Sequence, residues 1–171
     1  MRETCARYRV RMTGTSDAPV LDVRADDLSG APTRALIAAH HADMRATSPI
    51  ESCHVLDVDA LREPGVRFWS AWSGDRLAGI GALKDLGDGS GEIKSMRVDE
   101  AFRGTGVGRA VLSRILDDAR ERGMTRLWLE TGSQASFSPA RGLYASAGFE
   151  LCEPFGDYRP DRHSVFMTLV L

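Results

Sequence analysis

The stretch "SMRVDEAFRGTGVGRAVL", residues 95–112, joins a strand pattern to a helix pattern and decides the fold. Residues 92–99 alternate apolar and polar side chains, as a half-buried strand does. Residues 106–124 place apolar side chains on one stripe of a helix, and residues 125–131 follow as the next strand pattern. A strand, a helix and a strand in this order predict one crossover connection, with the two strands paired in parallel.

The turn inside this stretch, "RGTGVG", is rich in glycine. Gly104, Gly106 and Gly108 remove side chains from the turn, and the last two open the predicted helix. The first N–H groups of a helix have no partner inside the helix, and together with the helix dipole they favour an anion. Arg103 and Arg109 add positive charge on either side. The turn therefore predicts a site for a phosphate-bearing ligand, although a plain tight turn would use the same glycines.

Two glycine-rich nucleotide loops match this turn poorly. A Walker A loop ends in Gly-Lys-Ser/Thr, whereas Gly108 is followed by Arg109 and Ala110. A Rossmann turn needs a glycine at the sixth position counted from Gly104, where Arg109 stands. Glu130 does end the second strand where a ribose-binding acid would sit. A nicotinamide-dinucleotide-binding protein therefore stays open as a remote alternative.

The rest of the chain adds strand and helix patterns on both sides of this unit. The patterns predict further strands at residues 20–28, 66–74, 76–86, 149–155 and 164–171, and further helices at residues 31–46, 57–65 and 138–149. Together they predict an α/β (α+β) fold with a mixed central sheet of about seven strands, mostly antiparallel with one parallel pair, flanked by about four helices. Residues 1–18 are predicted to be a flexible N-terminal extension, and residues 19–171 a single domain.

Composition argues against several classes of function. The 171 residues carry 22 basic and 24 acidic side chains, a net charge of −2, which gives no reason to expect nucleic acid or a membrane as a partner. Cys5, Cys53 and Cys152 are widely spaced and form no CxxC pair, so neither a disulfide framework nor a metal site is predicted. The chain has no apolar run of the ~18 residues that a membrane span needs, and its basic N-terminus lacks the apolar core of a signal peptide. The predicted location is the cytoplasm.

Two motifs together resemble one protein family. "RGTGVG" is similar to the Arg/Gln-x-x-Gly-x-Gly/Ala pyrophosphate loop of the GNAT superfamily of N-acetyltransferases, with Arg103, Gly106 and Gly108 at the defining positions. "ARGLYASAGF" resembles the Ala-x-x-Leu-Tyr-x-x-x-Gly-Phe helix of the same family. The order of the predicted elements also agrees with that family over residues 20–171. The resemblance implies a GNAT fold, in which the parallel strand pair is splayed, and the transfer of an acetyl group from acetyl-CoA to an amine.

The resemblance assigns an acetyl-CoA site to the strand-to-helix stretch. The glycine loop would hold the pyrophosphate through Arg103, Gly104, Thr105, Gly106, Val107, Gly108 and Arg109. The backbone of Met96, Arg97 and Val98 would bond the pantetheine arm, because a splayed strand leaves backbone groups that need a partner. Tyr144 matches the family's general acid, which protonates the departing thiolate of coenzyme A. Phe137 stands where the family often has an asparagine that contacts the cofactor, so that contact is not predicted for this chain.

The acceptor side is less defined by motifs. Glu92 is the first candidate for the base that takes the amine proton, since the histone-acetylating branch of the family carries a glutamate there. Glu130, at the end of the next strand, is the second candidate or an anchor for the ammonium group of the substrate, and water is a third way to remove the proton. Ser52 and His54 lie in the variable region 48–56 and are candidate substrate contacts.

The predicted function is an N-acetyltransferase that acts on a small-molecule or amino-acid-like amine by direct attack in a ternary complex. The alternative is a non-catalytic acyl-CoA-binding sensor, in which Tyr144 is only a core aromatic residue and Glu92 only a surface glutamate. Retention of Tyr144 with two nearby carboxylates favours the enzyme. His40, on the apolar side of the first predicted helix, is expected in the core or at its boundary. A homodimer formed through the edge of the C-terminal strand is a further expectation.

Overall fold

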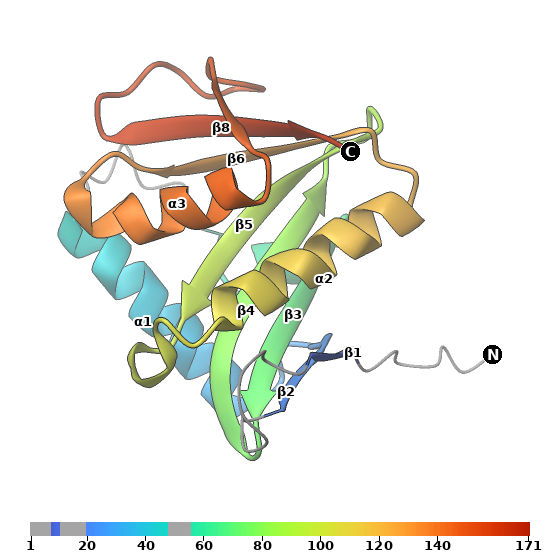
Figure 1. Cartoon of the computed structure of the whole chain (residues 1–171), viewed down its shortest axis with the longest axis vertical. Helices are drawn as coiled ribbons and strands as arrows, with labels where there is room; N and C mark the ends of the chain where they lie inside the picture. Colours follow the sequence, from blue (N-terminus) through green and yellow to red (C-terminus); the bar gives the residue numbers. More distant parts are fainter. Residues whose placement is uncertain (1–7, 11–19, 48–55) are drawn as a thin grey trace.

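The computed structural model describes residues 8–10, 20–47 and 56–171, and one mixed sheet forms its centre (Figure 1). The eight strands of the described residues lie in the order β1-β2-β3-β4-β5-β6-β8-β7. They are β1 (Tyr8–Val10), β2 (Leu21–Ala25), β3 (Val66–Ser73), β4 (Arg76–Asp85), β5 (Ser90–Val98), β6 (Arg126–Gly132), β7 (Glu150–Cys152) and β8 (Ser164–Val170). All neighbouring strands are antiparallel except β5 and β6, which are parallel.

The parallel pair opens partway along its length. The last paired residues of β5 and β6 are Ile93 and Leu129. Beyond them β5 continues to Val98 and β6 to Gly132, and the two strands diverge (Figure 1). The predicted splayed parallel pair is therefore confirmed, and the mixed, mostly antiparallel sheet is not the doubly wound parallel sheet that the remote dinucleotide-binding alternative would require.

Three α-helices of the described residues cover the two faces of the sheet (Figure 1). They are α1 (Ala31–Thr47), α2 (Val107–Glu121) and α3 (Ser138–Ser146). Val111 of α2 and Tyr144 of α3 share one buried cluster with Leu83 of β4, whereas Ile37 of α1 packs in a second buried cluster with Ile80 of β4. Residues an odd number apart on a strand point to opposite faces, so α2 and α3 lie on one face and α1 on the other.

The first turn of α2 is held close to the end of β5. A Cβ atom added to Gly108 would lie 3.5 Å from Val98 Cγ2 and 3.2 Å from Leu143 Cδ2 of α3. A larger side chain there would force these neighbours apart. The absence of a side chain at Gly108 therefore allows the helix start, the end of β5 and α3 to meet at one place, next to the splay.

Three details differ from the sequence-based expectations. The predicted helix at residues 57–65 is only a 3₁₀ turn, Ala60–Arg62, because Pro64 and Gly65 follow one residue after its end. Tyr8–Val10, inside the predicted extension, form β1 and pair with β2, while the boundary at residue 18 stays a prediction. The C-terminal strand β8 lies between β6 and β7, and β7 pairs with its residues Phe166–Thr168, so β8 is not the outermost strand that was expected; the homodimer stays a prediction. None of the described helices is long and apolar enough to cross a membrane.

Candidate active site

The turn before α2 has the backbone geometry of an anion site. Gly106 immediately precedes the helix with a φ of 89°, and Gly104 has a φ of 76°, both in the left-handed region that glycine adopts without strain. The first bond inside the helix runs from the Ala110 N–H to the Gly106 carbonyl, at 3.0 Å. The N–H groups of residues 107–109 therefore have no acceptor inside the helix. They stand at the positive end of the helix dipole, which favours a bound anion.

The side chains of this turn leave the amides accessible. Arg103 and Arg109 are exposed, and Arg103 forms a surface ion pair with Glu100 at 3.0 Å. The Thr105 hydroxyl donates to a backbone carbonyl of the turn at 2.7 Å, which fixes the loop shape. Val107 is buried in the core, so only its backbone can reach a ligand. The predicted pyrophosphate residues thus form one continuous surface turn.

The splayed part of β5 contains a bulge. Ser95 has a φ of 55°, and the pairing with β4 shifts so that Ser95 and Met96 together oppose Gly81. The bulge interrupts the alternation of side chains along β5. The Arg97 side chain turns toward α1, where it pairs with Asp43. On the other side of β5, its backbone no longer pairs with β6, which leaves peptide groups that a ligand could bond.

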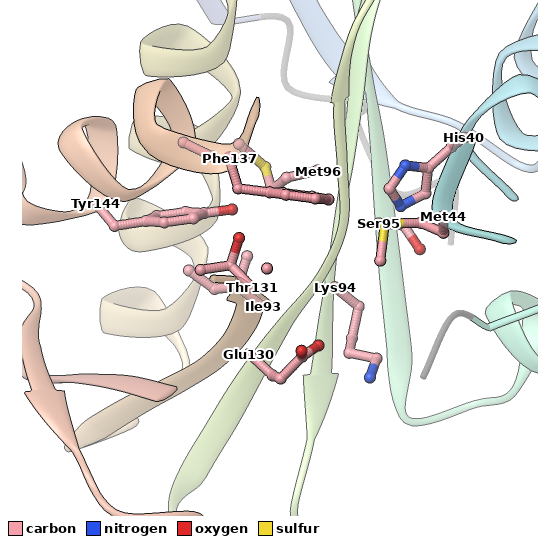
Figure 2. Close-up of a pocket in the computed structure, with 12 residues that line it drawn as sticks. His40, Met44, Ile93, Lys94, Ser95, Met96, Glu130, Thr131, Phe137 and Tyr144 are labelled. Carbon is pink, nitrogen blue, oxygen red and sulfur yellow. The ribbon is translucent and has the colours of Figure 1, made fainter. Parts of the chain in front are cut away.

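The splay, α1 and α3 surround a pocket of about 600 Å³ measured out to its open mouth. Figure 2 shows the side chains that line it. His40 and Met44 enter from α1, Phe137 and Tyr144 from α3 and the turn before it, and the diverging ends of β5 and β6 form the remaining wall.

Tyr144 carries its hydroxyl into this pocket (Figure 2). The side chain is buried, with 5% of its surface exposed, and its ring contacts Phe149 edge-on at 5.8 Å between centroids. Burial, with a further contribution from the Glu130 carboxylate, raises the pKa of the Tyr144 phenol above its usual value. The phenol therefore keeps its proton at every pH at which the protein is expected to work.

The two candidate acids have different surroundings. Glu130 lines the pocket. Glu92 lies deeper, with 5% of its surface exposed, and its Oε1 accepts hydrogen bonds from the Tyr158 hydroxyl at 2.6 Å and from Lys94 Nζ at 3.1 Å. Lys94 Nζ also donates to the Tyr158 hydroxyl at 2.8 Å. The sequence pattern indicated Glu92 as a site residue. In the structure it is the hydrogen-bond partner of Glu92, Lys94, that lines the pocket.

His40 belongs to the pocket as well as to the core boundary where it was expected. Burial and the nearby Arg97 guanidinium lower the pKa of His40 to about 4. The imidazole is therefore neutral near pH 7. It adds a polar but uncharged group to the wall opposite Tyr144 (Figure 2).

Some predicted site residues cannot be placed, and two residues of the site were not predicted from the sequence. Ser52 and His54 lie outside the described residues. Lys94 and Tyr158 were not predicted. Lys94 could have been found, because it lies two residues after Glu92 on one strand, and this spacing places both on one face. Tyr158 could not, because it lies in a loop without a motif. Among residues 8–10, 20–47 and 56–171, no three His, Cys, Asp or Glu side chains group as a metal site would require.

Comparisons with known proteins agree with this geometry. The family described as "Acetyltransferase (GNAT) family" matches residues 33–149. The chain belongs to the GNAT family of acetyltransferases. The uncharacterized N-acetyltransferase YsnE of Bacillus subtilis is 51% identical over 148 residues, which cover 86% of this chain and 98% of that protein. The chain is accordingly an acetyl-CoA-dependent N-acetyltransferase.

Two solved structures show the same fold. A Klebsiella pneumoniae protein assigned as an acyl-CoA N-acyltransferase superposes with a TM-score of 0.72 at 28% identity, over 88% of this chain and 97% of that one. The yncA acetyltransferase of Salmonella typhimurium, solved with acetyl-CoA, has a TM-score of 0.65 at 24% identity, over 88% of this chain and 93% of its own. Both likenesses span almost the whole described GNAT domain.

Proposed function

We propose that this GNAT enzyme transfers the acetyl group of acetyl-CoA directly to the amine of a small-molecule acceptor, with both substrates bound together. The observation that carries the proposal is the placement of Tyr144 and Glu130 on one pocket, at the opening between β5 and β6. A group that can donate a proton and a group that can accept one thus line the same pocket. Direct transfer needs both, because the leaving thiolate gains a proton and the attacking amine loses one.

The acetyl-CoA end of the site is assigned to β5 and the turn after it. The amides of residues 104–109 bind the pyrophosphate, and Arg103 and Arg109 add charge at its edges. The backbone of Met96 and Val98 bonds the pantetheine arm, where pairing with β6 has ceased. Arg97 takes part through its backbone only, because its side chain pairs with Asp43. The acetyl-CoA bound to the Salmonella relative supports this ligand class.

The chemical step balances without any further reactant. The amine nitrogen forms a bond to the thioester carbonyl carbon, the carbon–sulfur bond breaks, and its electron pair remains on sulfur. The Tyr144 hydroxyl donates its proton to that sulfur, and the amine proton goes to Glu130, directly or through a water molecule. A phenol is a weak acid compared with a thiol in water. Inside the pocket, burial raises the pKa of the Tyr144 phenol and also disfavours the bare thiolate, so its two effects on this proton transfer oppose each other.

Glu130 is preferred to Glu92 as the proton acceptor. The Glu92 carboxylate is buried and does not line the pocket, and its Oε1 already accepts hydrogen bonds from Lys94 and Tyr158, whereas Glu130 lines the pocket. Glu92 stays the alternative base if the acceptor or a water molecule reaches its second oxygen. The comparison of Glu130→Gln with Glu92→Gln therefore decides between them.

One experiment separates the enzyme from an acyl-CoA sensor. Calorimetry first measures acetyl-CoA binding, and a thiol-release assay with a library of small amines then measures turnover. Binding in the micromolar range together with thiol release for some amine supports the proposal. Tight binding with no thiol release for any amine would favour the sensor, and no binding would remove the cofactor assignment.

A further inference from the structure

Lys94 and Glu130 place opposite charges on the two sides of the splay. Ile93 and Leu129 are the last paired residues of β5 and β6, so Lys94 and Glu130 are the next residue on each strand. They also share one face of the sheet. Glu92 and Trp128 are paired across the two strands, and Lys94 and Glu130 each follow two residues later, on the same face as these partners. Both line the pocket, and Figure 2 shows them along the same edge of it.

The charge of Lys94 is held in a fixed place. The side chain is 11% exposed, and its ammonium group donates to Glu92 at 3.1 Å and to the Tyr158 hydroxyl at 2.8 Å. The Tyr158 ring is itself fixed between Phe155 and Phe166, at centroid distances of 4.9 and 5.4 Å. An ammonium group has three donors. Two are accounted for by these contacts, which leaves a third for a ligand in the pocket that Lys94 lines.

A buried ammonium group at a substrate pocket selects the charge of its ligand. It attracts a carboxylate and repels a second positive charge, and both effects are stronger away from bulk water. Glu130 alone would suit any ammonium group, including a diamine. Lys94 beside it disfavours the diamine and favours a molecule with a negative group close to its amine.

We propose that the acceptor carries a carboxylate next to its amine, as α-amino acids do, and that Lys94 binds this carboxylate while Glu130 faces the amine. Glu92 and Tyr158 are positioning residues that hold Lys94. This inference rests on the proposed acetyltransferase function and narrows it to one class of acceptor. It also gives the Glu92–Lys94–Tyr158 network a role that the transfer step itself does not require.

The test compares each α-amino acid with its own α-carboxamide, which keeps the amine and the side chain but lacks the negative charge. Thiol release is measured with acetyl-CoA for the wild-type chain and for Lys94→Met. The wild type is expected to prefer the amino acid after correction for the different amine pKa values. Lys94→Met is expected to lower the ratio of kcat/KM values, amino acid over amide, by about 10- to 100-fold, the size of one charged hydrogen bond. The change should appear mainly in the KM of the acceptor, with the KM of acetyl-CoA unaltered.

Two further variants guard against a folding defect. Lys94→Met leaves the buried Glu92 carboxylate without its cation, which destabilises a fold, so the double variant Lys94→Met/Glu92→Gln removes both charges and should show the same loss of preference. Tyr158→Phe keeps the aromatic packing and should lower the ratio by a smaller factor, about 2- to 10-fold, the size of one hydrogen bond. Lys84→Met, at the other lysine of the chain and outside the pocket, is the matched control and should leave the ratio unchanged.

The outcomes distinguish a failure of the carboxylate-binding role of Lys94 from a failure of the proposed acetyltransferase function. Equal loss of rate toward amino acids and amides in Lys94→Met and in the double variant would overturn the carboxylate assignment, as would a wild-type preference for diamines. In both of those cases thiol release still occurs and the acetyltransferase function stands. An absence of thiol release with every amine, while acetyl-CoA still binds, would instead overturn the proposed function.

Discussion

The turn before α2 and the Glu92–Lys94–Tyr158 network flank the splayed part of β5, and they are built in different ways. The turn is one continuous piece of chain, residues 103–109, and its binding groups are backbone amides at the start of a helix. The network joins β5 to a loop more than sixty residues later in the chain, through side-chain bonds at 2.6 to 3.1 Å.

The two regions therefore answer different binding requirements: the turn suits the pyrophosphate of acetyl-CoA, and the network suits one particular acceptor amine. A pyrophosphate is the same in every reaction of this kind, and a helix start with small residues is enough to hold it. An acceptor is recognised by charges at particular positions, which different side chains can supply. The first region is expected to control the binding of acetyl-CoA, and the second the choice of amine.

The largest effect is expected at the helix start. Gly106→Asp places a side chain and a negative charge where the pyrophosphate binds, and it should weaken acetyl-CoA binding by about 100-fold or more in calorimetry. Gly74→Asp is the matched control, because Gly74 also has a positive φ of 58° and lies in the turn between β3 and β4, outside the pocket. Unchanged affinity in Gly106→Asp would show that the loop does not hold the pyrophosphate.

A large but purely catalytic effect is expected at Tyr144. Tyr144→Phe keeps the buried ring and removes the proton donor, so kcat should fall by roughly 100-fold while the Kd of acetyl-CoA stays within about twofold. Because burial raises the pKa of Tyr144, the wild-type kcat should show no loss from ionisation of this phenol up to about pH 10, its ordinary value. If acetyl-CoA affinity collapses while turnover of the bound enzyme persists, the general-acid role is wrong.

A smaller effect, dependent on pH, is expected at Glu130. Glu130→Gln should lower kcat/KM for the acceptor by about 10-fold near pH 7, and the deficit should shrink as rising pH removes the amine proton in solution. Glu92→Gln, measured beside it, should show no such recovery. A deficit in Glu130→Gln that stays constant with pH would mean that Glu130 anchors the ammonium group without removing its proton.

The smallest effect concerns stability. The pKa of His40 is about 4 in the folded protein and about 6.5 in an unfolded chain. Between these values the unfolded state binds a proton that the folded state does not, so the free energy of unfolding should fall as pH decreases from 6.5 to 4. His40→Met should lack this part of the decrease, of about 1 to 3 kcal/mol. Denaturant unfolding at several pH values tests it, and parallel curves for the two proteins would contradict it.

Most of the fold followed from local patterns. The helix predicted at residues 106–124 is observed at Val107–Glu121, and the strand predicted at 92–99 at Ser90–Val98. The predicted helix at 57–65 did not form, because residues 57–65 are too short and end in Pro64 and Gly65. The position of β8 inside the sheet could not be read from its own alternating pattern, since alternation indicates burial of one face but not which strands lie beside it.

The sequence by itself determined the phosphate-binding turn, the motif tyrosine and the strand-to-helix order, because each depends on residues close together in the chain. Only the tertiary structure decided that Lys94 and Glu130 face one pocket, that Glu92 is held by Tyr158, and that His40 is neutral there. These properties depend on burial and on contacts between distant segments. No local pattern records them, because the energy of a charged group is set by its surroundings in the folded molecule.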